Sequence, residues 1–178
     1  IAAGMVPLLS KIPHALNAQK LTCRAIIETP SGSHAKYKFN EGCGAFELGK
    51  VLPASMSFPL NFGFVPSTHA EDGDPLDVLV LSEYPLPMGC MATVRLLGAM
   101  VAEQTQKGKT VRNDRLIARL REGTRYAGVD EMDQLGQSFA NELTRFFTLY
   151  NELRGRRFEV LSVGGPERAV ELVKATAI

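Results

Sequence analysis

Three aspartates, Asp72, Asp74 and Asp77, fall within six residues and run directly into the aliphatic sequence Val-Leu-Val-Leu at residues 78–81. A fully apolar run of this kind is typical of a buried strand. Asp77 therefore stands at the mouth of that strand, where burial of a bare carboxylate is costly. The fold has to bury the strand and still give the neighbouring carboxylates a way to offset their mutual repulsion.

Two interpretations of this acidic segment are open. The first is a solvated turn, because Asp, Gly and Pro all favour turns. The second, which we favour, is a site for a hard divalent cation such as Mg²⁺, whose preferred ligands include carboxylates. Gly73 allows the backbone to bend so that side chains on both sides of it converge. A calcium EF-hand does not fit, because Leu76 and Asp77 take its fifth and sixth loop positions and a strand follows.

The first two thirds of the chain has the pattern of a β-rich protein. Short apolar or alternating runs at residues 22–28, 35–39 and 45–51 are separated by turn-forming segments, and they predict the strands of a meander. A further strand pair is predicted at residues 91–102 and 111–120, joined across a polar segment. Together with the apolar run described above, these segments predict a mainly β core.

The last third changes character near Glu131, where apolar residues recur at three- and four-residue intervals. These residues are Leu135, Phe139, Leu143, Phe146, Phe147, Tyr150 and Leu153. Their spacing predicts an amphipathic helix with Gly155 as its stop. A strand at residues 156–163 and a second helix that begins at Pro166 follow. We therefore expect an α+β, mainly β fold, a small closed or partly closed barrel with helices on its outside.

Length and charge limit the classes of protein that remain. The 178 residues are close to the size of one domain, and we take residues 1–20 as an N-terminal extension. Lys and Arg total 20 against 19 Asp and Glu, so no overall field favours nucleic acid or a membrane surface as partner. No apolar stretch reaches the ~20 residues of a membrane span. Three widely spaced cysteines without a C-x-x-C pair indicate a reducing cytoplasm.

Two longer segments carry a family resemblance. FPLNFGFVP at residues 58–66 and AEDGDPLDVLV at residues 70–80 closely resemble the signature region of the family I soluble inorganic pyrophosphatases. The D-G-D-P-x-D core of that region is highly specific. Shorter matches are Ile27 to Pro30, Lys36-Tyr37, Tyr84 to Leu86, Asp114 to Ala118, and Phe146-Phe147 with Tyr150. The resemblance covers most of the chain from about residue 22 onward.

The resemblance implies a fold and an activity. Members of this family have a small OB-like β-barrel flanked by two or three helices, and they hydrolyse pyrophosphate to two phosphates with several Mg²⁺ ions. It also implies a homo-oligomer, most like the compact bacterial hexamers, and it leaves room for Mn²⁺ or another divalent cation. The chemistry is consistent, because a metal lowers the pKa of bound water and cations neutralise the charge of phosphoryl transfer.

The same resemblance assigns roles to individual residues. Asp72 and Asp77 correspond to ligands of the activating metals, with Glu28 supporting the metal site. Asp74 corresponds to the residue that orients or deprotonates the attacking water. Four residues are assigned to the phosphates of the substrate: Lys36, Lys50, Arg115, which stands where the family has a lysine, and Tyr150.

Several site positions depart from the family pattern. Lys38 stands where the family has an acid, which reverses a charge beside the site. Lys50 replaces an arginine and loses the bidentate fork of the guanidinium. Phe58 and Phe62 replace two tyrosines, so two hydroxyl groups that could hydrogen-bond to the site are absent.

Further departures fall on the strand pair and on the helix. Gln104 and Asn113 align with two metal-binding aspartates, although Glu103 or Asp114 could take their places if the register shifts by one. Asn151, which follows Tyr150, stands where the family has a lysine. Because these changes remove charge from both the metal shell and the phosphate clamp, they predict weaker metal binding and lower turnover.

The sequence is therefore compatible with three functions. The leading hypothesis is a cytoplasmic, Mg²⁺-dependent inorganic pyrophosphatase without nucleic-acid or membrane partners. The second is a pyrophosphatase-like binding or regulatory protein that has lost efficient catalysis. The third is a hydrolase of another phosphoanhydride, whose pocket is reshaped by Phe58 and Phe62.

Overall fold

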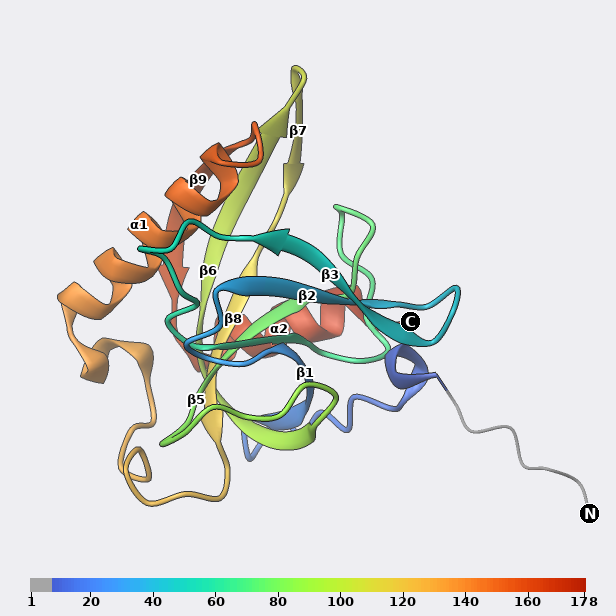
Figure 1. The fold of residues 1–178 in the computed structure, drawn as a ribbon. Helices are drawn as coiled ribbons and strands as arrows, with labels where there is room; N and C mark the ends of the chain where they lie inside the picture. The colour runs from blue at the N-terminus through green and yellow to red at the C-terminus, as the bar shows by residue number, and fades with distance from the viewer. Residues whose placement is uncertain (1–7) are drawn as a thin grey trace, which may run out of the picture.

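A closed ring of five strands forms the centre of the computed structural model, which describes residues 8–178 (Figure 1). The ring runs in the order β1 (Thr22–Thr29), β4 (Asn61–Phe64), β5 (Asp77–Leu81), β8 (Arg115–Leu120) and β6 (Met91–Gln106), which pairs back with β1. β5 and β8 are parallel, and the other neighbours are antiparallel. Closure leaves no free edge within the ring. The expected small OB-like barrel is confirmed.

β6 is longer than the barrel and continues beyond it. Its first part closes the ring with β1, and its last part pairs with β7 (Lys109–Arg112) and β9 (Arg157–Gly164). Irregularities at Leu96 to Gly98 and at Val101 to Ala102 bend the strand between these partners. In Figure 1, β6 and β7 project as an arm above the barrel. The single strand expected at residues 111–120 is therefore divided into β7 and β8.

The hairpin of β2 (Ala35–Asn40) and β3 (Ala45–Val51) is a separate two-stranded sheet, so the meander predicted for these segments is wrong where it joins β1. Side chains of β1 replace a backbone ladder at this join. Thr29 Oγ1 accepts a hydrogen bond from Tyr37 N at 3.0 Å, and Glu28 Oε1 accepts one from Phe39 N at 2.8 Å. The hairpin consequently stands away from the barrel wall.

The apolar run on β5 is explained by burial on both of its faces. Val78 and Val80 lie in the cluster that includes α2 (Pro166–Thr176), whereas Leu79 and Leu81 lie in the cluster that includes α1 (Gln137–Glu152). All four side chains are 2% exposed or less. Full burial of such side chains is worth ~1.5–3 kcal/mol each. The two helices thus cover the two sides of the strand.

The helix limits follow the predicted signals in part. α1 begins at Gln137 rather than near Glu131, because Met132–Leu135 form a separate 3-10 turn, η2, that ends at Gly136 with φ of 83°. At its other end, Gly155 N donates to Glu152 O and Arg156 N donates to Asn151 O. With Gly155 at φ of 68°, this is a Schellman closure, as predicted for that glycine.

The N-terminal extension packs on the barrel where it is described. Leu9, in the 3-10 turn η1 (Leu9–Lys11), and Ile12 pack against the cluster of Ile26, Phe39 and Phe64. The part of the extension at residues 1–7 lies outside the described residues. None of the helices formed by residues 8–178 has the length and apolarity that a bilayer crossing requires.

At Gly63, β4 and β1 pack so closely that a side chain has no room between them. A Cβ atom at this position would lie 2.0 Å from the Ile26 carbonyl oxygen on β1, so Gly63→Ala has to separate two paired strands. We expect the free energy of unfolding to fall by ~1–3 kcal/mol in urea titrations. Gly128→Ala is the control, because nothing lies within 4 Å of its Cβ position. Equal stabilities of the two variants would contradict this packing.

Candidate active site

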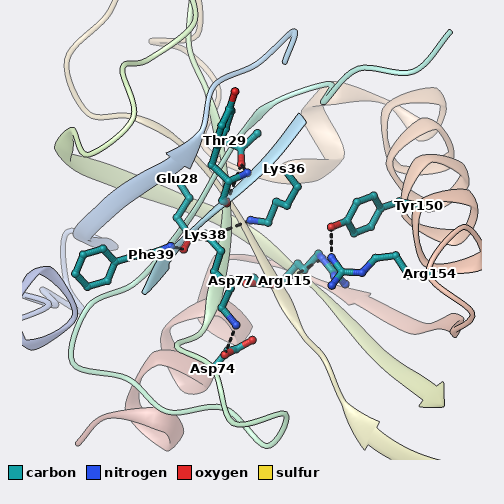
Figure 2. Close-up of polar contacts among 11 residues, drawn as sticks. Glu28, Thr29, Lys36, Lys38, Phe39, Asp74, Asp77, Arg115, Tyr150 and Arg154 are labelled. Carbon is teal, nitrogen blue, oxygen red and sulfur yellow. Dashed lines mark hydrogen bonds and ion pairs between the residues drawn. The ribbon is translucent and has the colours of Figure 1, made fainter. Parts of the chain in front are cut away.

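A cavity of about 750 Å³ lies where the β2–β3 hairpin, the aspartate loop and the end of α1 face one another (Figure 2). Seven of the eight residues expected at the site line it: Glu28, Lys36, Asp72, Asp74, Asp77, Arg115 and Tyr150. Lys50 does not. It lies on β3, the outer strand of the hairpin, and β2 separates that strand from the barrel.

Glu28 joins the barrel to the hairpin and positions a buried cation. Its Oε2 atom lies 3.1 Å from Lys36 Nζ, while its other oxygen accepts the hydrogen bond from Phe39 N. Lys36 Nζ also lies 3.4 Å from the ring centroid of Phe62. Burial lowers the pKa of Lys36, and the Glu28 carboxylate opposes that shift. Because both oxygens of Glu28 are engaged, the geometry favours support of Lys36 over direct binding of a metal.

The aspartate loop is a tight turn. Ala70 N donates to Asp74 O at 2.8 Å, Gly73 N donates to Ala70 O at 3.0 Å, and Asp74 N donates to Asp72 Oδ1 at 3.2 Å. Gly73 has a φ of 91°, so it provides the bend expected from the sequence. At the base of the loop, the buried Thr68 hydroxyl bonds to the backbone on both sides. The loop therefore holds its carboxylates along one wall of the cavity.

Asp77 and Arg115 face each other from the parallel strands β5 and β8. Arg115 Nε lies 3.7 Å from Asp77 Oδ2, which is too long for a hydrogen bond, and this buried N–H has no partner. The guanidinium carbon lies 4.4 Å from the ring centroid of Phe147 and 4.5 Å from that of Phe158. Burial raises the pKa of Asp77 to about 7, against the opposing effects of Arg115 and Lys36. Nη1 donates to Asn113 O at 3.3 Å, and a buried guanidinium that keeps an unpaired N–H is suited to an anion.

The chemistry of the loop fits a divalent cation. Burial raises the pKa of Asp72 as well as that of Asp77, which means that both carboxylates lack the solvation that a cation would replace. In the described part of the chain, residues 8–178, no three acidic, His or Cys side chains converge into a ready cluster. The arrangement therefore fits a divalent cation that is held by one or two carboxylates and keeps bound waters.

Lys38 reaches across the cavity from β2 to the tip of the loop. Its Nζ atom lies 2.7 Å from Asp74 Oδ1, and the two side chains are 53% and 46% exposed (Figure 2). Exposed pairs of this kind are worth ~0.2–1 kcal/mol. The lysine that replaces an acid thus neutralises Asp74 through a contact that is easily broken.

The two amides expected in place of aspartates form a pair. Asn113 Nδ2 donates to Gln104 Oε1 at 2.7 Å, and both residues line the cavity. Asp114 points elsewhere and accepts hydrogen bonds from Arg112 and from a backbone N–H of β6. Neither Asp114 nor Glu103 lines the cavity, so the register is not shifted and the amides stand at the wall.

The last turn of α1 and the residues that follow it supply one residue that we expected at the site and two that the sequence did not lead us to expect. Tyr150 lines the cavity, and its hydroxyl accepts a hydrogen bond from Arg154 Nη1 at 2.5 Å (Figure 2). Arg154 and Arg156 line the cavity as well. The available signal was the helical period, because Arg154 follows Tyr150 by four residues and such residues share a helix face.

Comparison with known proteins agrees with this geometry. Residues 25–177 match the family model described as inorganic pyrophosphatase. The chain belongs to the inorganic pyrophosphatase family. The inorganic pyrophosphatase of Thermus thermophilus is 35% identical over 153 residues, which cover 84% of this chain and 85% of that protein. That of Geobacillus stearothermophilus is 36% identical over 149 residues, which cover 84% and 88%.

Solved structures of the family have the same fold. The crystal structure of the pyrophosphatase from Thermus thermophilus has a TM-score of 0.86 at 34% identity and covers 96% of this chain and 97% of that one. A structure from Neisseria gonorrhoeae has a TM-score of 0.82 at 29% identity, with coverage of 94% and 95%. The barrel and its helices are therefore those of the inorganic pyrophosphatases.

The buried pair of Glu28 and Lys36 is expected to contribute to stability as a unit. Glu28→Gln retains an oxygen for Phe39 N but removes the charged hydrogen-bond partner of the buried Lys36 ammonium and leaves only the Asp77 charge near it, so we expect a loss of up to ~3–5 kcal/mol in the free energy of unfolding. Combining it with Lys36→Met should cost less than the sum of the two single changes, by ~0.5–3 kcal/mol. Chemical denaturation of the four proteins measures this coupling, and additive effects would refute it.

Proposed function

We propose that this chain hydrolyses inorganic pyrophosphate to two phosphates with the help of a divalent cation, Mg²⁺ first and Mn²⁺ as an alternative. The observation that carries the proposal is one cavity that combines three loop aspartates with the buried cations Lys36 and Arg115. Pyrophosphate requires both kinds of group, because its own charge needs cations and its hydrolysis needs an activated water. Membership of the inorganic pyrophosphatase family supports the same reaction.

The residues of the cavity divide the work in this proposal. Asp72 and Asp77 would hold the cation, which when bound supplies charge neutralisation for the phosphates and acidity for the attacking water. Asp74, at the half-exposed tip of the loop, accepts the proton of that water. Lys36 and Arg115, which both lie close enough to Asp77 to act on its charge, bind phosphate oxygens. Their burial strengthens these contacts, because charge-assisted hydrogen bonds are stronger where water is excluded.

Tyr150 and Lys50 have less direct roles in the proposed reaction. The Tyr150 hydroxyl faces the cavity and can donate a hydrogen bond to the leaving phosphate. Lys50 lies outside the cavity wall, so it adds positive charge at longer range only. The proposal therefore does not depend on Lys50 for phosphate binding.

A second candidate function is a pyrophosphate-binding protein with weak turnover. The observations that favour it are the neutral pair Gln104–Asn113 and the contact between Lys38 and Asp74. The pair supplies no carboxylate to a cation, and the lysine occupies an oxygen of the residue proposed to accept the proton. Both features reduce the demand for metal and the efficiency of water activation.

The remaining parts of the proposal concern assembly and setting. We propose a homo-oligomer, with the hexamer of the family resemblance as the first expectation. Exposed Leu149 on α1, Leu153 at its C-cap, and Leu161 and Val163 on β9 support it, because they place apolar surface on two adjacent elements. A reducing cytoplasm is supported by three cysteines without a disulfide. A single domain is supported by β5, whose two faces belong to the two large core clusters.

Phosphate release from pyrophosphate at millimolar Mg²⁺ tests the reaction. We expect turnover by the natural chain and a loss of about 100-fold or more in Asp74→Asn, because a positioned proton acceptor contributes roughly 10²–10⁴-fold. Asp133→Asn is the matched control, since Asp133 is exposed and does not line the cavity. If the natural chain releases no more phosphate than Asp74→Asn, the binding function replaces the enzymatic one.

Removal of Lys38 should strengthen cation binding at the loop. Lys38→Gln removes a positive charge that lies 2.7 Å from Asp74 and also acts on Asp72, a proposed ligand of the cation, and we expect the affinity for Mn²⁺ to rise by up to about fivefold. Titration calorimetry without substrate measures this change. Lys109→Gln, which alters an exposed lysine on β7 away from the cavity, should leave the affinity unchanged. A lower affinity in Lys38→Gln would show that the lysine does not compete with the ion.

A further inference from the structure

The α1 wall of the cavity lacks a charge that the family resemblance leads one to expect. Asn151 replaces a lysine and is 1% exposed. Its Nδ2 atom donates to Phe147 O at 2.8 Å, so one of its two amide N–H groups is committed to the helix itself. Asn151 therefore offers the cavity no positive charge.

Arg154 brings a charge back to the same wall. It lies four residues after Tyr150, and its guanidinium carbon lies 5.4 Å from the centroid of the tyrosine ring. Its Nη1 atom donates to the Tyr150 hydroxyl. Arg154 lines the cavity from a half-buried position, and within residues 8–178 it forms no ion pair with a carboxylate. Most of its five N–H donors are thus available to a ligand.

The backbone fixes this position. Arg154 N donates to Asn151 O, and the Schellman closure at Gly155 turns the chain sharply after it. The end of the helix therefore holds Arg154 next to Tyr150, rather than leaving it on a free terminus. Figure 2 shows the Arg154 side chain directed toward Tyr150, with Arg115 beyond it.

We propose that Arg154 binds the phosphate group that Tyr150 faces, and that it replaces the positive charge absent at Asn151. The inference rests on the proposed function for the identity of the anion. A guanidinium at this place can offer two parallel N–H groups to phosphate oxygens, which an ammonium cannot. Arg154 thereby gives this wall of the cavity paired N–H groups that match the oxygens of a phosphate group.

Arg156 is the neighbouring cation on the same wall, and its surroundings differ. Its Nε atom donates to Gln106 Oε1 at 3.1 Å on the β6 arm. That contact directs part of the Arg156 fork toward a protein acceptor. Each arginine thus makes one side-chain hydrogen bond, and that of Arg154 goes to a tyrosine hydroxyl that lines the cavity rather than to the β6 arm.

Binding of methylenediphosphonate, a pyrophosphate analogue that resists hydrolysis, tests the proposal in the full chain with Mg²⁺ present. Calorimetry should show a roughly 10- to 100-fold weaker affinity for Arg154→Gln, the range of a lost charge-assisted hydrogen bond. Arg157→Gln is the matched control, because Arg157 is exposed, pairs with Glu159 and does not line the cavity. It should bind as the natural chain does. Equal affinities of Arg154→Gln and Arg157→Gln would overturn the proposal.

A second comparison separates direct binding from support of Tyr150. If Arg154 contacts the phosphate, Tyr150→Phe combined with Arg154→Gln binds at least tenfold more weakly than Tyr150→Phe alone. If the double variant binds as Tyr150→Phe does, Arg154 acts only through the tyrosine and the proposal fails. Because the analogue is not hydrolysed, a natural chain that binds it but releases no phosphate from pyrophosphate defeats the proposed reaction and leaves the assignment of Arg154 intact.

Discussion

A single buried carboxylate, that of Glu28, connects the barrel to its cavity. One oxygen binds the backbone of β2 at Phe39, and the other binds the ammonium of Lys36. A normal backbone ladder between β1 and β2 would close the space between them. Because the side chains of Glu28 and Thr29 make the join instead, the hairpin stands off from the barrel, and the Lys36 ammonium lies in the space between them, over the ring of Phe62. Much of the geometry of the cavity follows from this use of side chains in place of a backbone ladder.

The charges of the cavity are distributed in an unusual way for a site proposed to use metal ions. Asp72 and Asp77 keep the desolvated carboxylates that favour a cation, as their raised pKa values show. Lys38 neutralises the third carboxylate, and the wall that carries Gln104 is neutral. Arg154 adds a further positive charge to the lining. Under the proposed function, these protein cations would take over part of the neutralisation that additional metal ions could provide.

The sequence predicted the features that depend on local pattern. The limits of β5, the stop at Gly155 and the bend at Gly73 were all correct, because each depends on a few adjacent residues. The closure of β6 onto β1 and the break between β7 and β8 depend on pairing between distant segments, which periodicity does not encode. β4 is short and contains Gly63, so it gave little strand signal. In the site, the family resemblance identified the neutral Asn151 but not Arg154. Arg154, which we propose replaces the missing charge, lies about one helical turn after Asn151 rather than at the position where the family has its lysine.

The hydrogen bond between Asn113 and Gln104 also removes a source of repulsion from the cavity wall. Two aspartates held this close would repel each other until an ion arrived, and the folded chain would then gain much of its robustness from dissolved magnesium. Each amide here satisfies the other and neither gains or loses a proton near neutral pH. This pair of side chains therefore needs neither a bound ion nor a change of protonation to stay in contact.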